Sequence, residues 1–216
     1  MLTTGDRVLF QGDSITDCGR DKAFDPPHTD PAQRGTSLGN GYPLFIAAQL
    51  AADRPELNLT IRNLGISGNR IVDLAARIKE HGWNLQPTVL SILLGINDTW
   101  HTFSRDSGVD HVRFERTYRH LLADTRERLP EVRLVLCEPF LLPCGVAGQG
   151  WFEDLAPRQA VVRQLAKEFS AVFVPFQAAF DEASRRAPPA HWAGDGVHPS
   201  PAGHQIMARA WLAAVG

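Results

Sequence analysis

The chain has 216 residues, of which 44% are hydrophobic, and this is enough to bury one substantial core. We therefore expect a single domain over residues 1–216. The formal net charge of -2 gives no basic surface of the kind that nucleic acids favour, which excludes nucleic acid as an expected partner. No stretch is apolar enough to span a bilayer and the chain does not begin like a signal peptide, so we expect a cytoplasmic protein without a membrane partner.

Five short runs of branched apolar residues alternate with amphipathic stretches, a pattern typical of a parallel sheet covered by helices on both faces. The predicted strands are, in chain order, Arg7–Gln11, Thr60–Leu64, Thr88–Leu94, Arg133–Cys137 and Ala171–Val174. The predicted helices are Tyr42–Ala52, Ile71–Glu80, Val112–Leu129, Pro157–Phe169, Phe176–Arg185 and Pro201–Ala214. Together they predict an α/β fold, a three-layer αβα sandwich with a five-stranded parallel sheet.

Two long segments, 17–40 and 139–157, interrupt this rhythm with glycine, proline and charge. Loops of this length in a compact domain are usually binding walls or lids, although surface decoration is the simpler alternative. Ligands of doubly wound sheets bind beyond the carboxyl ends of the strands. We therefore expect both segments to frame a site at that edge.

A candidate nucleophile and a candidate base lie far apart in the sequence. Ser14 ends a Gly-Asp-Ser tripeptide directly after the first predicted strand, and Asp195 precedes His198 by three residues in a tight turn before the last helix. A carboxylate at that spacing can hold an imidazole in the orientation that activates a serine, so the three predict a Ser-His-Asp triad of a serine hydrolase. The simpler alternatives are a helix cap for Ser14 and ordinary turn residues for the other two.

Donors for an oxyanion are expected at the ends of the next two strands. Gly68 follows the second strand and lacks a side chain that would obstruct its backbone N–H, while the Asn97 amide after the third strand can donate without titrating. With the Ser14 N–H they would make three donors. Purely local turn roles for Gly68 and Asn97 are compatible with this function.

These blocks, in this order, resemble the SGNH hydrolases of the GDSL esterase superfamily, with the nucleophile in a GDS motif, the glycine, a GxND motif and a DxxH motif. The resemblance implies a flavodoxin-like SGNH hydrolase fold, the catalytic residues Ser14, Asp195 and His198, and an oxyanion hole formed by Ser14, Gly68 and Asn97. The sequence around these motifs also resembles a narrower group, intracellular acetyl esterases that act on xylan-derived sugars. It implies an acetylesterase acting on acetylated xylo-oligosaccharides.

Three further residues are candidates for substrate binding. Trp100 and Trp192 flank the GxND and DxxH motifs, so their ring faces could stack on a sugar, although core packing is an equal alternative. Arg20 could reach a substrate hydroxyl, with bridging of its own loop as the stronger alternative.

No cofactor and no metal are expected, because the histidines form no HExxH pattern and the three cysteines, Cys18, Cys137 and Cys144, lack CxxC spacing and are predicted to be reduced thiols. The partner would be a small-molecule acetyl ester. A lysophospholipase or acyl-thioesterase is the alternative enzyme, and a catalytically silent carbohydrate-binding or assembly protein is the alternative class. Trp83 and Trp211 would permit a homo-oligomer.

Overall fold

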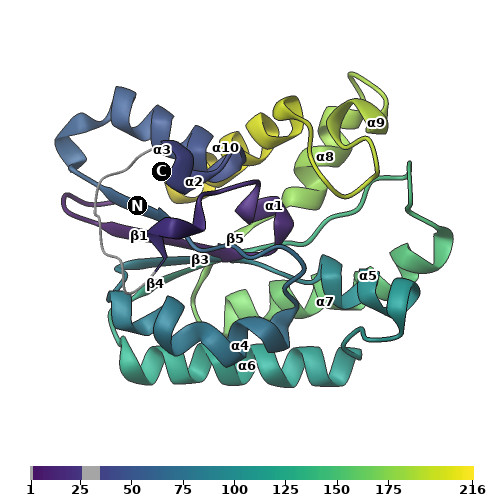
Figure 1. Cartoon of the computed structure of the whole chain (residues 1–216), viewed down its shortest axis with the longest axis horizontal. Helices are drawn as coiled ribbons and strands as arrows, with labels where there is room; N and C mark the ends of the chain where they lie inside the picture. The colour runs from purple at the N-terminus through teal and green to yellow at the C-terminus, as the bar shows by residue number, and fades with distance from the viewer. Residues whose placement is uncertain (1, 26–34) are drawn as a thin grey trace.

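The structure, a computed structural model, describes residues 2–25 and 35–216. Five parallel strands form one sheet in the order β2-β1-β3-β4-β5 (Figure 1). This order places a topological switch point between β1 and β3, as in flavodoxin-like folds. The α/β fold with a five-stranded parallel sheet is confirmed, and each predicted strand end lies within one residue of the observed one. The strands are β1 (Arg7–Gly12), β2 (Thr60–Asn63), β3 (Val89–Leu93), β4 (Arg133–Cys137) and β5 (Val172–Val174).

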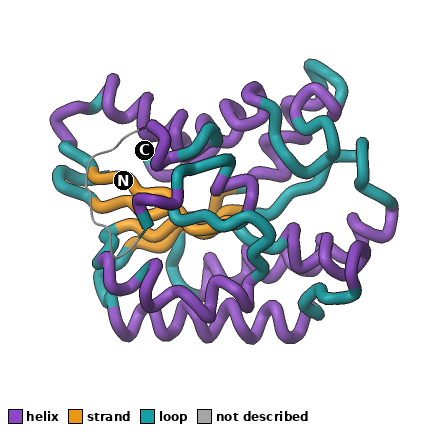
Figure 2. The backbone as a smooth tube through the Cα atoms, in the orientation of Figure 1, coloured by secondary structure: helices purple, strands orange, loops and turns teal. Residues whose placement is uncertain are grey.

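Helices cover both faces of this sheet (Figures 1 and 2). On one face α10 packs against α3 and α8, and on the other α4 packs against α6, which packs against α7. The described helices are α1 (Ser14–Asp17), α2 (Gly35–Leu38), α3 (Tyr42–Asp53), α4 (Ile71–His81), α5 (Ile96–Arg105), α6 (His111–Arg128), α7 (Gln149–Glu168), α8 (Phe176–Ser184), α9 (Pro189–Trp192) and α10 (Pro201–Val215), with 3₁₀ turns η1 (Lys22–Phe24), η2 (Pro55–Leu57) and η3 (Trp83–Leu85).

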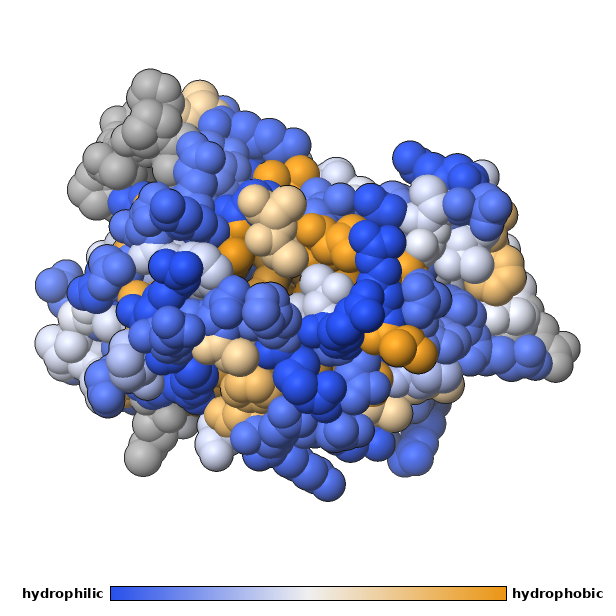
Figure 3. All heavy atoms as spheres, turned by 90° about the horizontal axis from the view of Figure 1, so that it is seen from below, coloured by the Kyte–Doolittle hydropathy of each residue, from blue (hydrophilic) through white to orange (hydrophobic). Residues whose placement is uncertain are grey.

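The two helical layers bury two separate apolar clusters because successive strand residues point to opposite faces of the sheet. Val8 and Phe10 of β1 pack with Trp211 of α10, whereas Leu9 packs with Tyr118 of α6. Both faces of β1 are therefore apolar, as expected for a central strand of a parallel sheet covered on both sides. Figure 3, the view from below, shows that the outer face on the α4 and α6 side is mostly hydrophilic. Within the described residues, no helix combines the length and apolar character needed to cross a membrane.

One prediction of secondary structure is wrong, and one helix was missed. The segment 139–157 was expected to be one long loop, but α7 begins at Gln149 and contains Pro157 in its interior. Proline normally marks a helix start because it lacks an N–H and crowds the preceding turn. Here the added turns pack Leu155, which is 1% exposed, into the core, and this burial offsets the lost hydrogen bond. Helix α5 was not predicted.

The tryptophans expected to permit self-association lie inside the protein. Trp211 is fully buried and its indole N–H donates to Ser91 Oγ at 3.0 Å. Trp83 is 9% exposed and donates to Thr125 Oγ1 at 2.9 Å. Neither ring contributes a surface for a second copy of the chain.

Candidate active site

The sequence-predicted residues come together at the carboxyl edge of the sheet. Ser14 begins α1 directly after β1, Gly68 lies in the turn after β2, and Asn97 is in the first turn of α5 after β3. Asp195 and His198 lie in the turn between α9 and α10. Because all five strands run parallel, their carboxyl ends share one edge, and ligands of this fold class bind there (Figure 1).

Three side chains form an unbroken hydrogen-bonded chain. Ser14 Oγ lies 2.8 Å from His198 Nε2, and His198 Nδ1 lies 2.6 Å from Asp195 Oδ2. The contact with a carboxylate, which only accepts, places the ring proton on Nδ1 and leaves Nε2 as the acceptor for the serine proton. The arrangement can therefore activate the Ser14 hydroxyl as a nucleophile.

The carboxylate of Asp195 is held in its ionised form. Burial acts to raise its pKa, but hydrogen bonds from the His198 imidazole and from the backbone N–H groups of His198 and Val197 together outweigh burial and lower the pKa below its usual range. The two backbone donors contact Oδ1 at 2.7 and 2.9 Å, which leaves Oδ2 for the imidazole. One carboxylate thus fixes both the turn and the ring.

The loop before α7 supports this turn, which revises its expected role as a binding wall. Val146 N donates to Asp195 O at 3.0 Å, and Leu142 N donates to Gly196 O at 2.9 Å. Gly145 lies so close that a Cβ on it would be 2.3 Å from Asp195 Cα, so only glycine fits there. The other expected wall, 17–40, is partly described, and its residues 26–34 lie outside the described part of the chain.

A buried carboxyl group precedes the nucleophile. Asp13 caps α1, with Oδ1 accepting from Ile15 N at 3.0 Å, while its Oδ2 is buried without a hydrogen-bond partner among the described residues. Burial raises the pKa of Asp13 to about 7, against the smaller lowering effects of the Ile15 N–H and of His198. The cap holds the turn that presents Ser14.

Replacing Asp13 with Asn should flatten the pH dependence of stability. Because the folded pKa is about 7 and the unfolded pKa is about 4, the folded protein binds more protons between these pH values, so Asp13 makes stability fall as pH rises. An asparagine at this position would not titrate, and its Oδ1 could still accept from Ile15. From pH 5 to pH 8 the free energy of unfolding should therefore fall less in Asp13→Asn than in the parent. The difference between the two falls should be on the order of 1 kcal/mol or more. Urea unfolding at both pH values measures this, and identical pH slopes in the two proteins would contradict it.

Two of the candidate oxyanion donors, Gly68 and Asn97, have surroundings that suit this role. Gly68 adopts a φ of 84°, a left-handed conformation that favours glycine, and no atom lies within 4 Å of where a Cβ would be. Asn97 Nδ2 donates to Asn69 O at 3.2 Å. That bond uses one amide hydrogen and fixes the amide orientation, which leaves the second hydrogen for a ligand.

Asn69, which follows Gly68 directly, was not predicted to be a site residue. Its carbonyl orients Asn97, and its side chain accepts from Arg77 Nε at 2.7 Å. Arg77 in turn donates to Gln11 of β1 at 2.7 Å. Its position next to Gly68 was the one feature of the sequence that could have indicated a role for Asn69. Its contact with Arg77 of α4 could be found only from the fold.

Removing the Asn97 amide should slow turnover more than it weakens binding. If this amide stabilises charge that develops only in the transition state, Asn97→Ala should lower kcat about 100-fold or more with little change in KM. Steady-state kinetics on an acetyl ester measures both constants, and circular dichroism checks the fold. A raised KM with kcat unaltered would contradict an oxyanion role.

The three residues expected to bind substrate have different environments. Trp100, on α5 with Asn97, is half-buried, and its ring centroid lies 5.7 Å from that of His198. It is therefore next to the candidate base, and its substrate contact stays a prediction.

Trp192 and Arg20 take the alternative roles considered for them. Trp192 is 7% exposed and its N–H donates to Ala187 O at 3.2 Å, so it packs in the core. Arg20 is 5% exposed, with Nε donating to Gly65 O at 2.7 Å and Nη2 to Asp25 Oδ2 at 3.1 Å. It bridges two loops, and the substrate contacts expected of Trp192 and Arg20 stay predictions.

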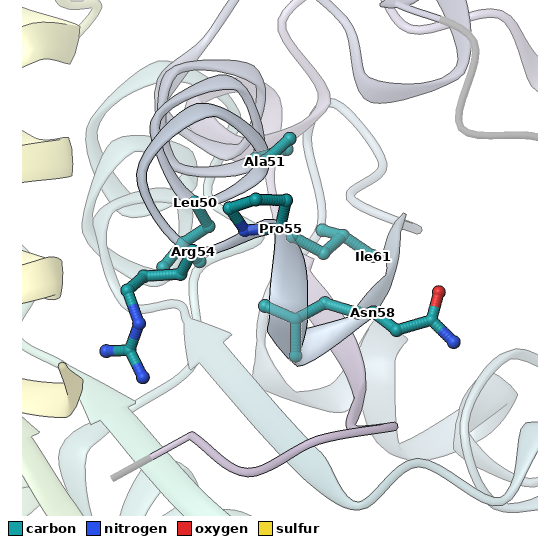
Figure 4. Close-up of a pocket in the computed structure, with 8 residues that line it drawn as sticks. Leu50, Ala51, Arg54, Pro55, Asn58 and Ile61 are labelled. Carbon is teal, nitrogen blue, oxygen red and sulfur yellow. The ribbon is translucent and has the colours of Figure 1, made fainter.

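The pocket drawn in Figure 4 lies elsewhere. It has a volume of about 210 Å³ and is formed by α3, η2 and the beginning of β2, with Leu50, Arg54 and Ile61 among its lining residues. Because the strands are parallel, the beginning of β2 lies at the edge opposite Ser14. Among the described residues, no group of three or more His, Cys, Asp or Glu side chains is arranged to hold a metal ion.

The known proteins to which this chain is similar include hydrolases. The model of the GDSL-like lipase/acylhydrolase family matches residues 10–206. The acetylxylan esterase of Geobacillus stearothermophilus is 38% identical over 222 residues, covering 100% of this chain and 96% of that protein. The crystal structure of Axe2, an acetylxylan esterase from the same organism, is 37% identical with a TM-score of 0.88, covering 100% of this chain and 96% of that one.

Two other solved structures have similar folds. A protein described as a GDSL-like lipase from Parabacteroides merdae is 41% identical with a TM-score of 0.93, over 100% of this chain and 98% of that one. LAE5, an α/β hydrolase from the metagenome of Lake Arreo, is 32% identical with a TM-score of 0.87, over 98% and 95%. This chain belongs to the GDSL-like lipase/acylhydrolase family and is a carboxylic ester hydrolase.

Proposed function

We propose that this protein is a serine acetyl esterase that removes acetyl groups from small acetylated carbohydrates, acetylated xylo-oligosaccharides above all. The hydrogen-bonded chain Ser14–His198–Asp195 carries the proposal. In it, Ser14 is the nucleophile, His198 the base and Asp195 the residue that orients the imidazole.

In the first half of the reaction, Ser14 Oγ attacks the ester carbonyl while His198 Nε2 takes the hydroxyl proton. The negative charge on the carbonyl oxygen is met by the N–H groups of Ser14 and Gly68 and by the Asn97 amide. As the carbonyl re-forms, its bond to the alcohol oxygen breaks, and His198 gives its proton to that oxygen. The sugar alcohol leaves and an acetyl group remains on Ser14.

In the second half, water takes the place of the alcohol. His198 removes a proton from the water as its oxygen bonds to the acetyl carbon, and the same donors hold the second oxyanion. The bond to Ser14 Oγ then breaks and Oγ regains a proton from His198. Acetic acid leaves and loses its proton to the solvent, and the site returns to its starting protonation.

The similar proteins support both the chemistry and the substrate. The relative from Geobacillus stearothermophilus is called an acetylxylan esterase, and a structure of Axe2 from that organism is described as an acetyl-xylooligosaccharide esterase. Two solved structures are catalytic mutants of Axe2, one with a serine and one with an aspartate changed to alanine, which are the residue types proposed here. An intracellular site of action is also part of the proposal, supported by three unpaired cysteines, since disulfides are rare in reducing compartments.

A substrate panel tests the proposal. Acetyl esters should have a kcat/KM at least about 100-fold above that of octanoyl esters, and acetylated xylo-oligosaccharides should exceed lysophospholipids, because specificity is a ratio of transition-state affinities. Preference for long acyl chains or thioesters would move the assignment to a lysophospholipase or acyl-thioesterase. Absence of turnover on every ester would favour the catalytically silent carbohydrate-binding or assembly protein.

A further inference from the structure

A row of aromatic rings leads from the candidate base toward the surface. The centroid of Trp100 lies 5.7 Å from that of His198, Trp151 lies 5.1 Å from Trp100, and Phe103 lies 5.6 Å from Trp151. Trp100 and Phe103 come from α5 and Trp151 from the first turn of α7. We call Trp100, Phe103 and Trp151 the aromatic ledge.

The outer end of the aromatic ledge is open to solvent. Phe103 is 49% exposed, and its ring stacks on Trp151 with an interplanar angle of 14°. Gly150 lies beside the Phe103 ring, and a Cβ there would be 3.4 Å from it, in ordinary van der Waals contact. Trp100 and Trp151 pack against the core below. Phe103 is therefore supported by protein on one side and exposed on the other, which is unlike a ring that merely fills a core.

The position of the ledge indicates which part of the ester it faces. In the proposed reaction, His198 gives its proton to the departing alcohol, whereas the carbonyl oxygen points at Gly68 and Asn97. The alcohol must therefore lie against the imidazole. The ledge begins at Trp100, which contacts that imidazole, and continues outward through Trp151 to Phe103.

We propose that the aromatic ledge is a sugar subsite, which binds pyranose rings of the alcohol part of the substrate. The C–H faces of a pyranose pack well on aromatic faces, and an open ledge leaves the sugar hydroxyls in water. An acyl chain would instead gain most from an enclosed apolar channel. This inference rests on the proposed function, and it assigns Trp151 and Phe103 as specificity-determining residues.

Two substitutions test the subsite. Phe103→Ala and Trp151→Ala should each lower the ratio of kcat/KM for acetylated xylo-oligosaccharides to kcat/KM for ethyl acetate by about three- to tenfold, mainly through a higher KM for the oligosaccharide. Trp151→Phe should restore part of the ratio. Val112→Ala is the control, because Val112 is an apolar residue of α6 that is 74% exposed and lies outside the aromatic ledge, and its loss should leave the ratio unaltered.

Calorimetric binding of unacetylated xylotriose provides a readout that does not depend on turnover. Wild-type protein should bind it, and both alanine variants should bind it about three- to tenfold more weakly. The subsite would be overturned if both alanine variants kept the parental kcat/KM ratio and the parental affinity for xylotriose. It would also be overturned if the variants lost kcat/KM only on esters of longer acyl chains. The proposed function would fail if the wild-type protein hydrolysed simple acetyl esters but no acetylated sugar. A wild type that also binds no xylotriose would overturn both.

Discussion

Replacing Ser14 with Ala should abolish nearly all ester hydrolysis, by on the order of 10⁴-fold or more in kcat/KM. The substitution removes the oxygen that would bond to the acyl carbon, and within the described residues no second hydroxyl contacts His198 Nε2. His198→Ala should cost a similar factor, because the serine proton then has no acceptor. The double variant should be no worse than either single variant, since the two side chains act as one proton-transfer unit.

Hydrolysis of an acetyl ester, followed to very low rates, measures these losses. A covalent label gives a second readout, because a serine-directed organophosphate should modify one residue of the parent and none in Ser14→Ala. Ser104→Ala is a suitable control, since Ser104 is an exposed serine on α5, and it should keep parental activity. Folded Ser14→Ala protein with near-parental turnover would remove Ser14 from the mechanism.

The centre of the sheet could be predicted from the sequence because its strands contain long apolar runs. Both faces of the 133–137 strand, for example, are buried after its first residue, so its pattern needs no knowledge of its neighbours. The start of α7 could not be predicted in the same way. Pro157 gave a false local signal, and the contacts that outweigh it, such as that of Leu155 with the core, link distant segments.

The positions of candidate site residues could be predicted where a sequence motif determines them. They were harder to predict where the packing of neighbouring loops determines the environment of a side chain. Ser14, Asp195 and His198 lie together as expected from their motifs. The environments of Arg20 and Trp192 depend on which loop packs over them, and no local pattern encodes that. The position of Trp192 beside the DxxH motif therefore did not predict its burial.

Replacing Asp195 with Asn should cost about 10⁴-fold in turnover while leaving the turn intact. In the protein, Asp195 Oδ1 accepts from two backbone N–H groups and Oδ2 accepts from His198 Nδ1. In the variant only the amide oxygen can accept, so it stays on the backbone donors and the NH₂ group faces the imidazole. Nδ1 must then accept, its proton moves to Nε2, and Nε2 can no longer take the proton of Ser14.

Kinetics and proton NMR together check this tautomer argument. The parent should show a hydrogen-bonded Nδ1–H resonance from His198, and Asp195→Asn should lose it while keeping its circular dichroism spectrum. Asp124→Asn is the matched control, because Asp124 Oδ2 lies 3.6 Å from His120 Nε2 on the exposed side of α6, another aspartate–histidine pair, and its loss should leave turnover at the parental level. An Asp195→Asn variant within about tenfold of parental turnover would mean that His198 keeps its working tautomer without the carboxylate, and the orienting role of Asp195 would be wrong.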